Sequence, residues 1–313
     1  MAQNTTNSQA FIEAEQYSAF ILRNLHDGLL PSNMFRNVSD FPAGSTLNIK
    51  TIGSVTIQDG AEDQAFVSTP IDSGIVTLNI NKYKGDSWHV TDELREDGSQ
   101  VEALMAARAS ESTRAIQEVF ETDFLAQCNA AQTNANANAY NGFNHRIASS
   151  ETNNVISLKH ISNMKLAFDK ANVPAAGRIL IVDPVVGATL QELVTITSDM
   201  SPIAKEILTT GFERDHQFIM NIYGFDIITS NRLPTGTFSD GTTSVSSAVA
   251  NIAMCVADDN CRPVMGAWRR MPKVETERVP SLRRDVFYAS CRYGFAAQRT
   301  DTLGVIITSA TSH

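Results

Sequence analysis

Two segments of alternating hydrophobicity, followed directly by a long helical pattern, constrain the fold of this chain more than any other feature. In residues 44–90, apolar side chains alternate with polar ones in TLNIKTIGSVTIQDG and again in SGIVTLNINKYKG. The stretch between them is acidic and rich in turn-forming residues, so the pattern predicts a long two-stranded ribbon with a polar tip. Because an isolated two-stranded hairpin is only marginally stable in water, the ribbon must be covered either by its own chain or by a second molecule.

The segment from Ser99 to Cys128 predicts one long helix. Ser99 and Glu102 have the spacing of a capping box, and apolar residues then recur at helical spacing: Val101, Leu104, Met105, Ala115, Ile116, Val119, Phe120 and Phe124. Such a helix spans about 45 Å, well beyond the usual length. A long ribbon that leads directly into a long helix is an elongated arrangement that compact enzyme domains rarely have, which favours a second molecule as the cover.

The remainder of the chain predicts a mixed α+β architecture. Residues 1–40 begin polar, as an arm that crosses a neighbour or as a frayed terminus, and residues 11–25 predict a short helix ending near Gly28 or Pro31. The polar stretch 130–142 predicts a surface loop or linker. The elements expected after it are a helix between Ser157 and Pro174, a strand at 178–183, a helix from Pro184, two strands in FIMNIYGFDIITSN, a buried strand at 248–257, two long strands at 266–279 and 285–298, and a last strand at 305–309.

Charge is distributed unevenly along the chain. The formal net charge is -9 and the sequence pI about 5.2, which argues against sequence-specific DNA or RNA binding and leaves contact with packaged nucleic acid open. Residues 262–299 hold nine basic and three acidic residues, so this segment carries +6 and the remainder of the chain -15. Two surfaces of opposite sign suit head-to-tail association of like subunits, and a solvated basic strand pair is the alternative.

Cysteine usage and hydropathy indicate a protein made and used in solution. No signal peptide is apparent at the start of the sequence, and no apolar stretch approaches the length of a membrane span. Free thiols in a reducing cytoplasm are therefore expected for the four cysteines, which have no metal-binding spacing: Cys128, Cys255, Cys261 and Cys291.

Motifs of enzymatic chemistry are missing from the sequence, which predicts no catalytic, cofactor or metal site. Asp258-Asp259 follows a predicted strand, where an α/β protein often keeps metal ligands, although paired acids there are usually solvated turn residues. Asp183-Pro184 could orient a ligand or begin a helix. His160 is expected to be structural or solvated, and Trp88 and Trp268 are either interface anchors or core residues; the other histidines are scattered at His26, His89, His145, His216 and His313.

The order of these elements resembles that of the major capsid proteins of tailed bacteriophages, which have the HK97-like fold. LNINKYKGDSWHVTDEL followed by the Ser99 helix is similar to the second strand of the family's E-loop running into its spine helix. GRILIVDPVVGATL is similar to a strand and helix of the axial domain, and IMNIYGFDIITSNRLP matches the family's pattern of strand, GF, strand and SN.LP. Together these phrases and their spacing cover most of residues 15–310.

The resemblance implies an α+β subunit with four units. These are an N-terminal arm at 1–43, an E-loop hairpin at 44–90, a peripheral domain with the spine helix at 91–154 and 263–300, and an axial domain at 155–262 and 301–313. It further implies pentamers and hexamers that close an icosahedral shell around a dsDNA phage genome, with the E-loop on the neighbouring subunit. The shell would be assembled in the host bacterial cytoplasm and become the virion capsid.

Expected partners are other copies of the chain, a separate scaffolding protein, a portal and possible decoration proteins, with non-specific contact to packaged dsDNA and no membrane. Lys82 and Lys84 are expected on the ribbon, but no acceptor motif accompanies them, so no covalent cross-link is predicted. Two alternatives remain: an encapsulin-like compartment shell, which shares the fold, and an α/β enzyme that uses Asp183 or Asp258-Asp259.

Overall fold

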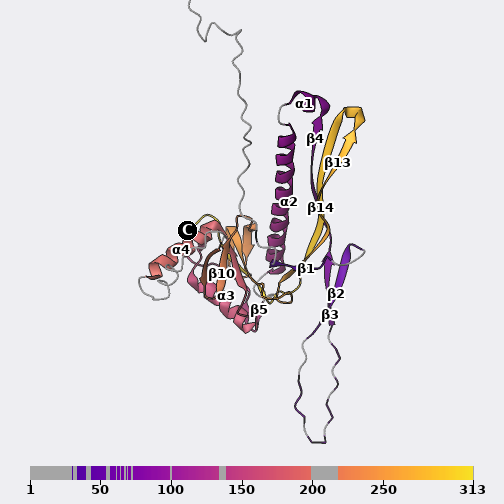
Figure 1. The fold of residues 1–313 in the computed structure, drawn as a ribbon. Helices are drawn as coiled ribbons and strands as arrows, with labels where there is room; N and C mark the ends of the chain where they lie inside the picture. Colours follow the sequence, from indigo (N-terminus) through magenta and orange to yellow (C-terminus); the bar gives the residue numbers. More distant parts are fainter. Residues whose placement is uncertain are drawn as a thin grey trace, which may run out of the picture.

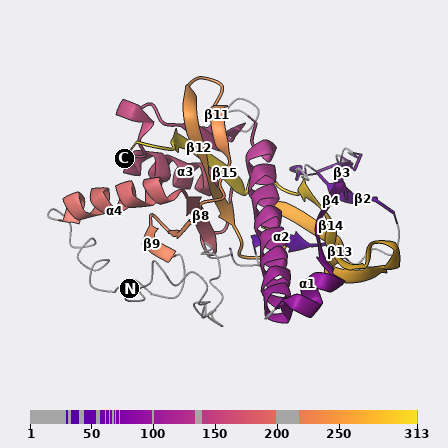
Figure 2. The same ribbon diagram turned by 90° about the horizontal axis from the view of Figure 1, so that it is seen from above.

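The computed structural model describes residues 30, 34–39, 44–53, 57–60, parts of 61–71, 73–98, 101–133, 139–198 and 218–312. The helix expected at 11–25 and the Ser99 member of the capping box lie outside these residues. The structure contains two β-sheets with the long helix α2 (Val101–Ala131) between them, and a two-stranded ribbon that extends away from both (Figures 1 and 2). The expected α+β fold class is confirmed.

A four-stranded sheet and α2 form one body of the molecule. The strand order is β1 (Arg36–Asn37), β13 (Val264–Val279), β14 (Arg284–Ala297) and β4 (Lys82–Thr91). Helix α2 has 31 residues and lies along one face of the sheet, and the short helix α1 (Asp92–Asp97) joins it to β4 near the β13–β14 turn (Figure 1). The prediction of a long helix and two long strands is confirmed.

A seven-stranded sheet forms the second body. Its order is β7 (Arg146–Ala148), β15 (Leu303–Ser309), β12 (Ser244–Cys255), β8 (Arg178–Val182), β10 (Phe225–Thr229) and β9 (Phe218–Ile222), with β11 (Thr235–Ser239) also paired to β12. Every residue of β8 and β15 is buried. Helices α3 (Leu158–Lys170) and α4 (Pro184–Ser198) contribute Met164, Phe168 and Leu190 to the same core. A small hairpin of β5 (Ala139–Tyr140) and β6 (Phe143–Asn144) connects α2 to this body.

The ribbon consists of β2 (Thr46–Ile52) and β3 (Ser73–Asn79), paired antiparallel from Thr46 opposite Asn79 to Ile52 opposite Ser73. Its base packs on the four-stranded sheet, where Leu78 and Ile80 join a buried cluster with Met265. Gly294 permits this contact, because a Cβ there would lie 2.1 Å from the Asn79 carbonyl oxygen. Beyond the base the ribbon projects away from the body (Figure 1).

The sequence pattern and the structure differ at the second half of the ribbon. SGIVTLNINKYKG reads as one alternating strand, but in the structure β3 ends at Asn79 and the following strand, β4, pairs with β14 along its whole length. Alternation reports only that each strand has two unlike faces, and it does not identify the partner strand. In the part of the chain that the structure describes, no helix is long and apolar enough to cross a membrane.

Candidate assembly surface

The acidic residues that the sequence offers as possible metal or ligand contacts instead make contacts that stabilise turns and a helix start. The backbone carbonyl of Asp258 accepts the N–H groups of Cys261 and Arg262, and the Asp259 carboxylate pairs with Arg262, so both acids belong to a turn. The Asp183 carboxylate accepts the N–H of Val185 at 3.1 Å at the start of α4, and burial raises the pKa of Asp183. Among the described residues, no group of three or more His, Cys, Asp or Glu could hold a metal ion.

The other residues considered from the sequence also lie in structural positions. His160 caps α3, because its Nδ1 accepts the Ser157 N–H at 3.1 Å. Trp268 stacks on Phe120 of α2 with ring centroids 4.3 Å apart, and Trp88 stacks on Phe287 at 5.6 Å. The two tryptophans are therefore part of the packing between α2 and the sheet.

A cavity of about 370 Å³ lies beside α3 and the β5–β6 hairpin. It is lined by Gly142, Phe143, Asn144, Arg146, Ile147, Asn163, Leu166 and Asp240, a set that includes neither Asp183 nor the Asp258-Asp259 pair. The Asp240 carboxylate accepts three backbone N–H groups, from Ala148, Thr242 and Thr243, which fits a structural role in the turn that holds it.

Among the described residues, the most exposed large apolar side chains lie on the ribbon and on the segment between its strands, whose described residues within 57–71 we name the ribbon tip. The exposed fractions are 81% for Ile52, 87% for Ile57, 70% for Phe66 and 83% for Ile71. Covering one such side chain contributes about 1.5–3 kcal/mol, so the exposed set is a strong driving force for association. Its acidic neighbours are Asp59, Glu62 and Asp63.

The face of the four-stranded sheet opposite α2 offers a surface of contrasting character. Lys82, Lys84 and Tyr293 point toward α2, where all three reach the Asp123 carboxylate. Their sequence neighbours point the other way, because successive side chains of a strand alternate. Away from the ribbon base, this opposite surface, which we name the distal sheet face, includes Tyr83, Arg270, Lys273, Glu275, Tyr288 and Arg292.

Charges on the distal sheet face are partly compensated. Lys273 and Arg270 lie 3.2 and 3.8 Å from the Glu275 carboxylate. Arg292 stands between Tyr83 on β4 and Arg270 on β13, is exposed, and has no ion pair among the described residues. The structure thus places an exposed, net basic and aromatic surface on a chain whose ribbon tip is acidic and apolar. Lys82 and Lys84, expected on the ribbon, belong instead to β4.

Exposed ion pairs connect α1 to the end of the four-stranded sheet at the β13–β14 turn, which we name the sheet end. Arg278 donates to both carboxylate oxygens of Asp92, at 2.6 and 2.7 Å, and Asp285 accepts from Arg278 and Arg95. The hydrogen bonds from Arg278 lower the pKa of Asp92. A single exposed ion pair contributes little to stability, but a network of shared pairs holds the sheet end in one arrangement.

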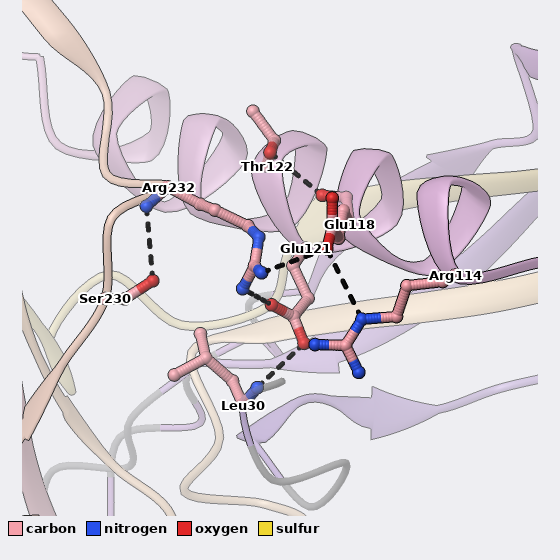
Figure 3. A network of polar contacts seen from close by, with 7 residues as sticks. All are labelled: Leu30, Arg114, Glu118, Glu121, Thr122, Ser230 and Arg232. Carbon is pink, nitrogen blue, oxygen red and sulfur yellow. Dashed lines mark hydrogen bonds and ion pairs between the residues drawn. The ribbon is translucent and has the colours of Figure 1, made fainter. Parts of the chain in front are cut away.

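A buried polar network joins the two bodies of the molecule (Figure 3). Arg232, which follows β10, lies 2.9 Å from Glu121 and 3.4 Å from Glu118, both on α2. Glu118 also pairs with Arg114 at 3.3 Å, and Glu121 accepts the Leu30 N–H at 2.7 Å. Burial raises the pKa of Glu121. We name Glu118, Glu121 and Arg232 the joint, because they connect α2, the seven-stranded sheet and the chain at Leu30.

Part of this surface could be predicted from the sequence. The ribbon and the basic segment 262–299 were identified from alternation and charge count. The joint was not, because Glu118 and Glu121 look like ordinary polar residues of a helix and Arg232 lies 111 residues after Glu121. The charge count also includes cations with partners inside the chain, such as Arg262 and Arg278, so it overstates the free basic surface.

The sequence profile of the family described as phage capsid protein matches residues 75–308. Among solved structures, the chain is similar to that of Mycobacterium phage Che8, with 18% identity, a TM-score of 0.68 and coverage of 97% of this chain and 98% of that chain. It is also similar to the capsid structure of the cyanophage P-SCSP1u, with 14% identity, a TM-score of 0.74 and coverage of 99% and 96%. No curated protein sequence matches it.

The holo-SrpI encapsulin complex from Synechococcus elongatus PCC 7942 is similar too, with 12% identity, a TM-score of 0.61 and coverage of 100% of this chain and 99% of that chain. At this level of identity, structural similarity establishes the fold alone, whereas the sequence profile distinguishes the family. The chain therefore belongs to the phage capsid protein family and is a major capsid protein with the HK97-like fold, whose copies assemble into the shell of a virion.

Proposed function

We propose that the chain forms pentamers and hexamers of an icosahedral shell that encloses a phage dsDNA genome, in which the ribbon of each copy lies on its neighbour. The observation that carries this proposal is the apolar ribbon with no cover from the described part of its own chain. Each interface between two subunits contributes modestly, and the closed shell is stable because it contains many copies of these interfaces. The role is structural, without catalysis.

We propose that the chain is divided into four structural units. The arm is 1–43, the E-loop 44–90, the peripheral domain 91–154 with 263–300, and the axial domain 155–262 with 301–313. Two strands near these boundaries pair across them: β4 lies in the sheet with β14, and β7 lies in the sheet with β15. The first pairing anchors the E-loop to the peripheral domain, and the second anchors the segment after the spine helix to the axial domain.

The distal sheet face is the surface that suits a neighbour's ribbon. Phe66 and Ile57 of the ribbon offer apolar area, and Tyr83 and Tyr288 offer aromatic area in return. The acidic tip would approach Arg292, which supplies a cation without an ion-pair partner among the described residues. Charge complementarity of this kind fixes register more than it adds affinity.

Assembly is proposed to occur in the host bacterial cytoplasm, with a separate scaffolding protein, a portal and decoration proteins as further partners. Contact with packaged dsDNA would be non-specific. The net charge of -9 supports this, because an acidic shell limits adhesion to the genome and lets the DNA be packed and released.

Removing the ribbon tip tests the proposal. A variant in which residues 58–74 are replaced by a short Gly-Ser turn should keep its circular dichroism spectrum and thermal transition, because the tip adds little to the core. It should form few or no shells in negative-stain microscopy. A matched control replaces only the polar residues 58–60 by Gly-Ser-Gly and should assemble. Normal shells from the deleted variant would refute the ribbon's role.

A further inference from the structure

The turn between β12 and β13 brings two cysteines together. Cys255 is the last residue of β12, and Cys261 follows six residues later, before β13 begins at Val264. Neither is in a disulfide. The segment between them is the connection from the seven-stranded sheet to the four-stranded sheet.

Backbone hydrogen bonds hold both ends of this turn. The Cys255 N–H donates to the Thr302 carbonyl at 3.2 Å and the Val256 N–H to the Gly177 carbonyl at 2.8 Å. The Asp258 carbonyl accepts the Cys261 N–H at 2.9 Å, which closes the turn and brings Cys261 back toward the end of β12. Cys261 then packs against the core cluster that contains Cys255.

The two thiols lie at the two ends of this closed turn and differ in access. The Cys255 Sγ faces the carbonyls of Pro174 and Ala176, at 3.9 and 3.7 Å, and is buried. Burial raises the pKa of Cys255, and the neighbouring Cys261 thiol raises it further. Cys261 is partly exposed, so a reagent can reach it first. Cys128 and Cys291 are buried.

We propose that Cys255 and Cys261 are a dithiol that closes to an intramolecular disulfide when the protein leaves a reducing medium for an oxidising one. The oxidant is a low-molecular-weight disulfide such as oxidised glutathione. The Cys261 thiolate attacks one of its sulfurs and releases the first thiol. The deprotonated Cys255 sulfur then attacks Cys261 Sγ and expels the second. Two protein thiols become one disulfide, and one reagent disulfide becomes two thiols.

The bond would stiffen the connection between the two sheets. With Cys255 joined to Cys261, the free chain from β12 to β13 shortens from residues 256–263 to 262–263. A closed loop also restricts the unfolded chain. A phage shell is made in a reducing cytoplasm and survives outside it, so the bond would form after the shell leaves the host and would stiffen the subunit there. This consequence alone rests on the proposed function.

Mass spectrometry of the native protein tests the proposal. Treatment with oxidised glutathione should remove two hydrogens per chain, and cleavage before Asp258 should leave the Cys255 and Cys261 peptides joined. The Cys128→Ala/Cys291→Ala variant should behave in the same way, and Cys261→Ser should gain no intramolecular bridge. No mass loss in the native wild type, or a bridge between other cysteines, would overturn the proposal.

A trivalent arsenical tests the proximity of the thiols without oxidation, because it binds two nearby sulfurs together. Phenylarsine oxide should bind the reduced native wild type at one site per chain and should fail to bind Cys261→Ser. Oxidised wild type should melt at a higher temperature than its reduced form, with no such difference in Cys261→Ser. Both measurements use unassembled protein, so their failure is independent of whether shells form.

Discussion

His145 shows how a single buried residue couples the fold to pH. Its side chain is fully buried, stacks on Phe168 with ring centroids 5.5 Å apart, and meets the edge of Tyr140 at 4.7 Å. Burial lowers the pKa of His145, and the hydrogen bond with the Phe143 carbonyl only partly opposes this. Burial lowers the pKa of His160 as well. Both rings are therefore harder to protonate in the folded chain than in the unfolded chain.

This arrangement predicts a loss of stability in mild acid. Below about pH 6.5 the unfolded chain takes up protons at these histidines, whereas the folded chain does not, so the free energy of unfolding falls as the pH falls toward the folded pKa. Each unit of lowered pKa corresponds to about 1.4 kcal/mol. Between pH 7.5 and 5.0, the melting temperature of His145→Phe should fall less than that of the wild type. The melting temperature of the control His89→Asn, which changes an exposed residue, should fall as much as that of the wild type.

Helix α2 is held on two sides at one level of its length, around residues 118–121. One face packs on the four-stranded sheet through an aromatic cluster in which Phe120 contacts Trp268, Tyr293 and Phe295. The joint holds the other side to the segment after β10 and to Leu30.

Removing the arginine of the joint should destabilise the subunit strongly. Arg232→Leu leaves the buried Glu121 carboxylate without the cation that lies 2.9 Å from it, which costs about 3 kcal/mol in urea unfolding. The control Arg299→Ala breaks an exposed pair with Asp301 and should cost less than about 1 kcal/mol. Adding Glu121→Gln to Arg232→Leu should recover part of the loss, because no uncompensated charge remains. A cost for Arg232→Leu no larger than for Arg299→Ala would contradict this account of the joint.

At the scale of the whole molecule, the chain is two bodies with a ribbon reaching beyond them (Figure 1). The ribbon tip is acidic and apolar, and the distal sheet face is basic and aromatic. The two surfaces lie on different parts of one chain, so each can meet its complement on another copy. Repetition of such a contact generates a ring where the rotation from one copy to the next closes.

Charge reversal tests the pairing of these surfaces. Arg292→Glu should slow assembly, measured by light scattering and microscopy, because it places an acid opposite the acidic tip; adding Glu62→Lys and Asp63→Lys should restore it. The control Lys165→Glu, on α3, should assemble as the wild type does. Raising the salt concentration from about 50 to about 500 mM should narrow the difference in assembly rate between Arg292→Glu and the wild type, because salt screens the charges. Failure of the compensating reversal would show that the tip meets another surface.

The ribbon base, α2, β8, β12 and the long β13–β14 pair could be predicted from sequence because each depends on local periodicity. Alternation marks a strand with unlike faces, an apolar run such as RILIV marks a buried one, and helical spacing marks α2, although Leu104 and Val119 of that pattern are exposed. The cap on α3 was partly visible, because Ser157 and His160 lie three residues apart. These features are encoded within a few residues of one another.

The partner of each element was decided by tertiary structure. Whether β4 continues the ribbon or joins β14, whether Trp268 faces a neighbour or α2, and whether Arg232 meets Glu121 all depend on contacts between distant segments. Side-chain pattern determines which faces of an element must be covered, and packing of the whole chain determines what covers them. The ribbon is where the described chain leaves that requirement open. Its apolar side chains are exposed to water within the described residues, and burial of that surface is the driving force by which we propose that it meets another copy.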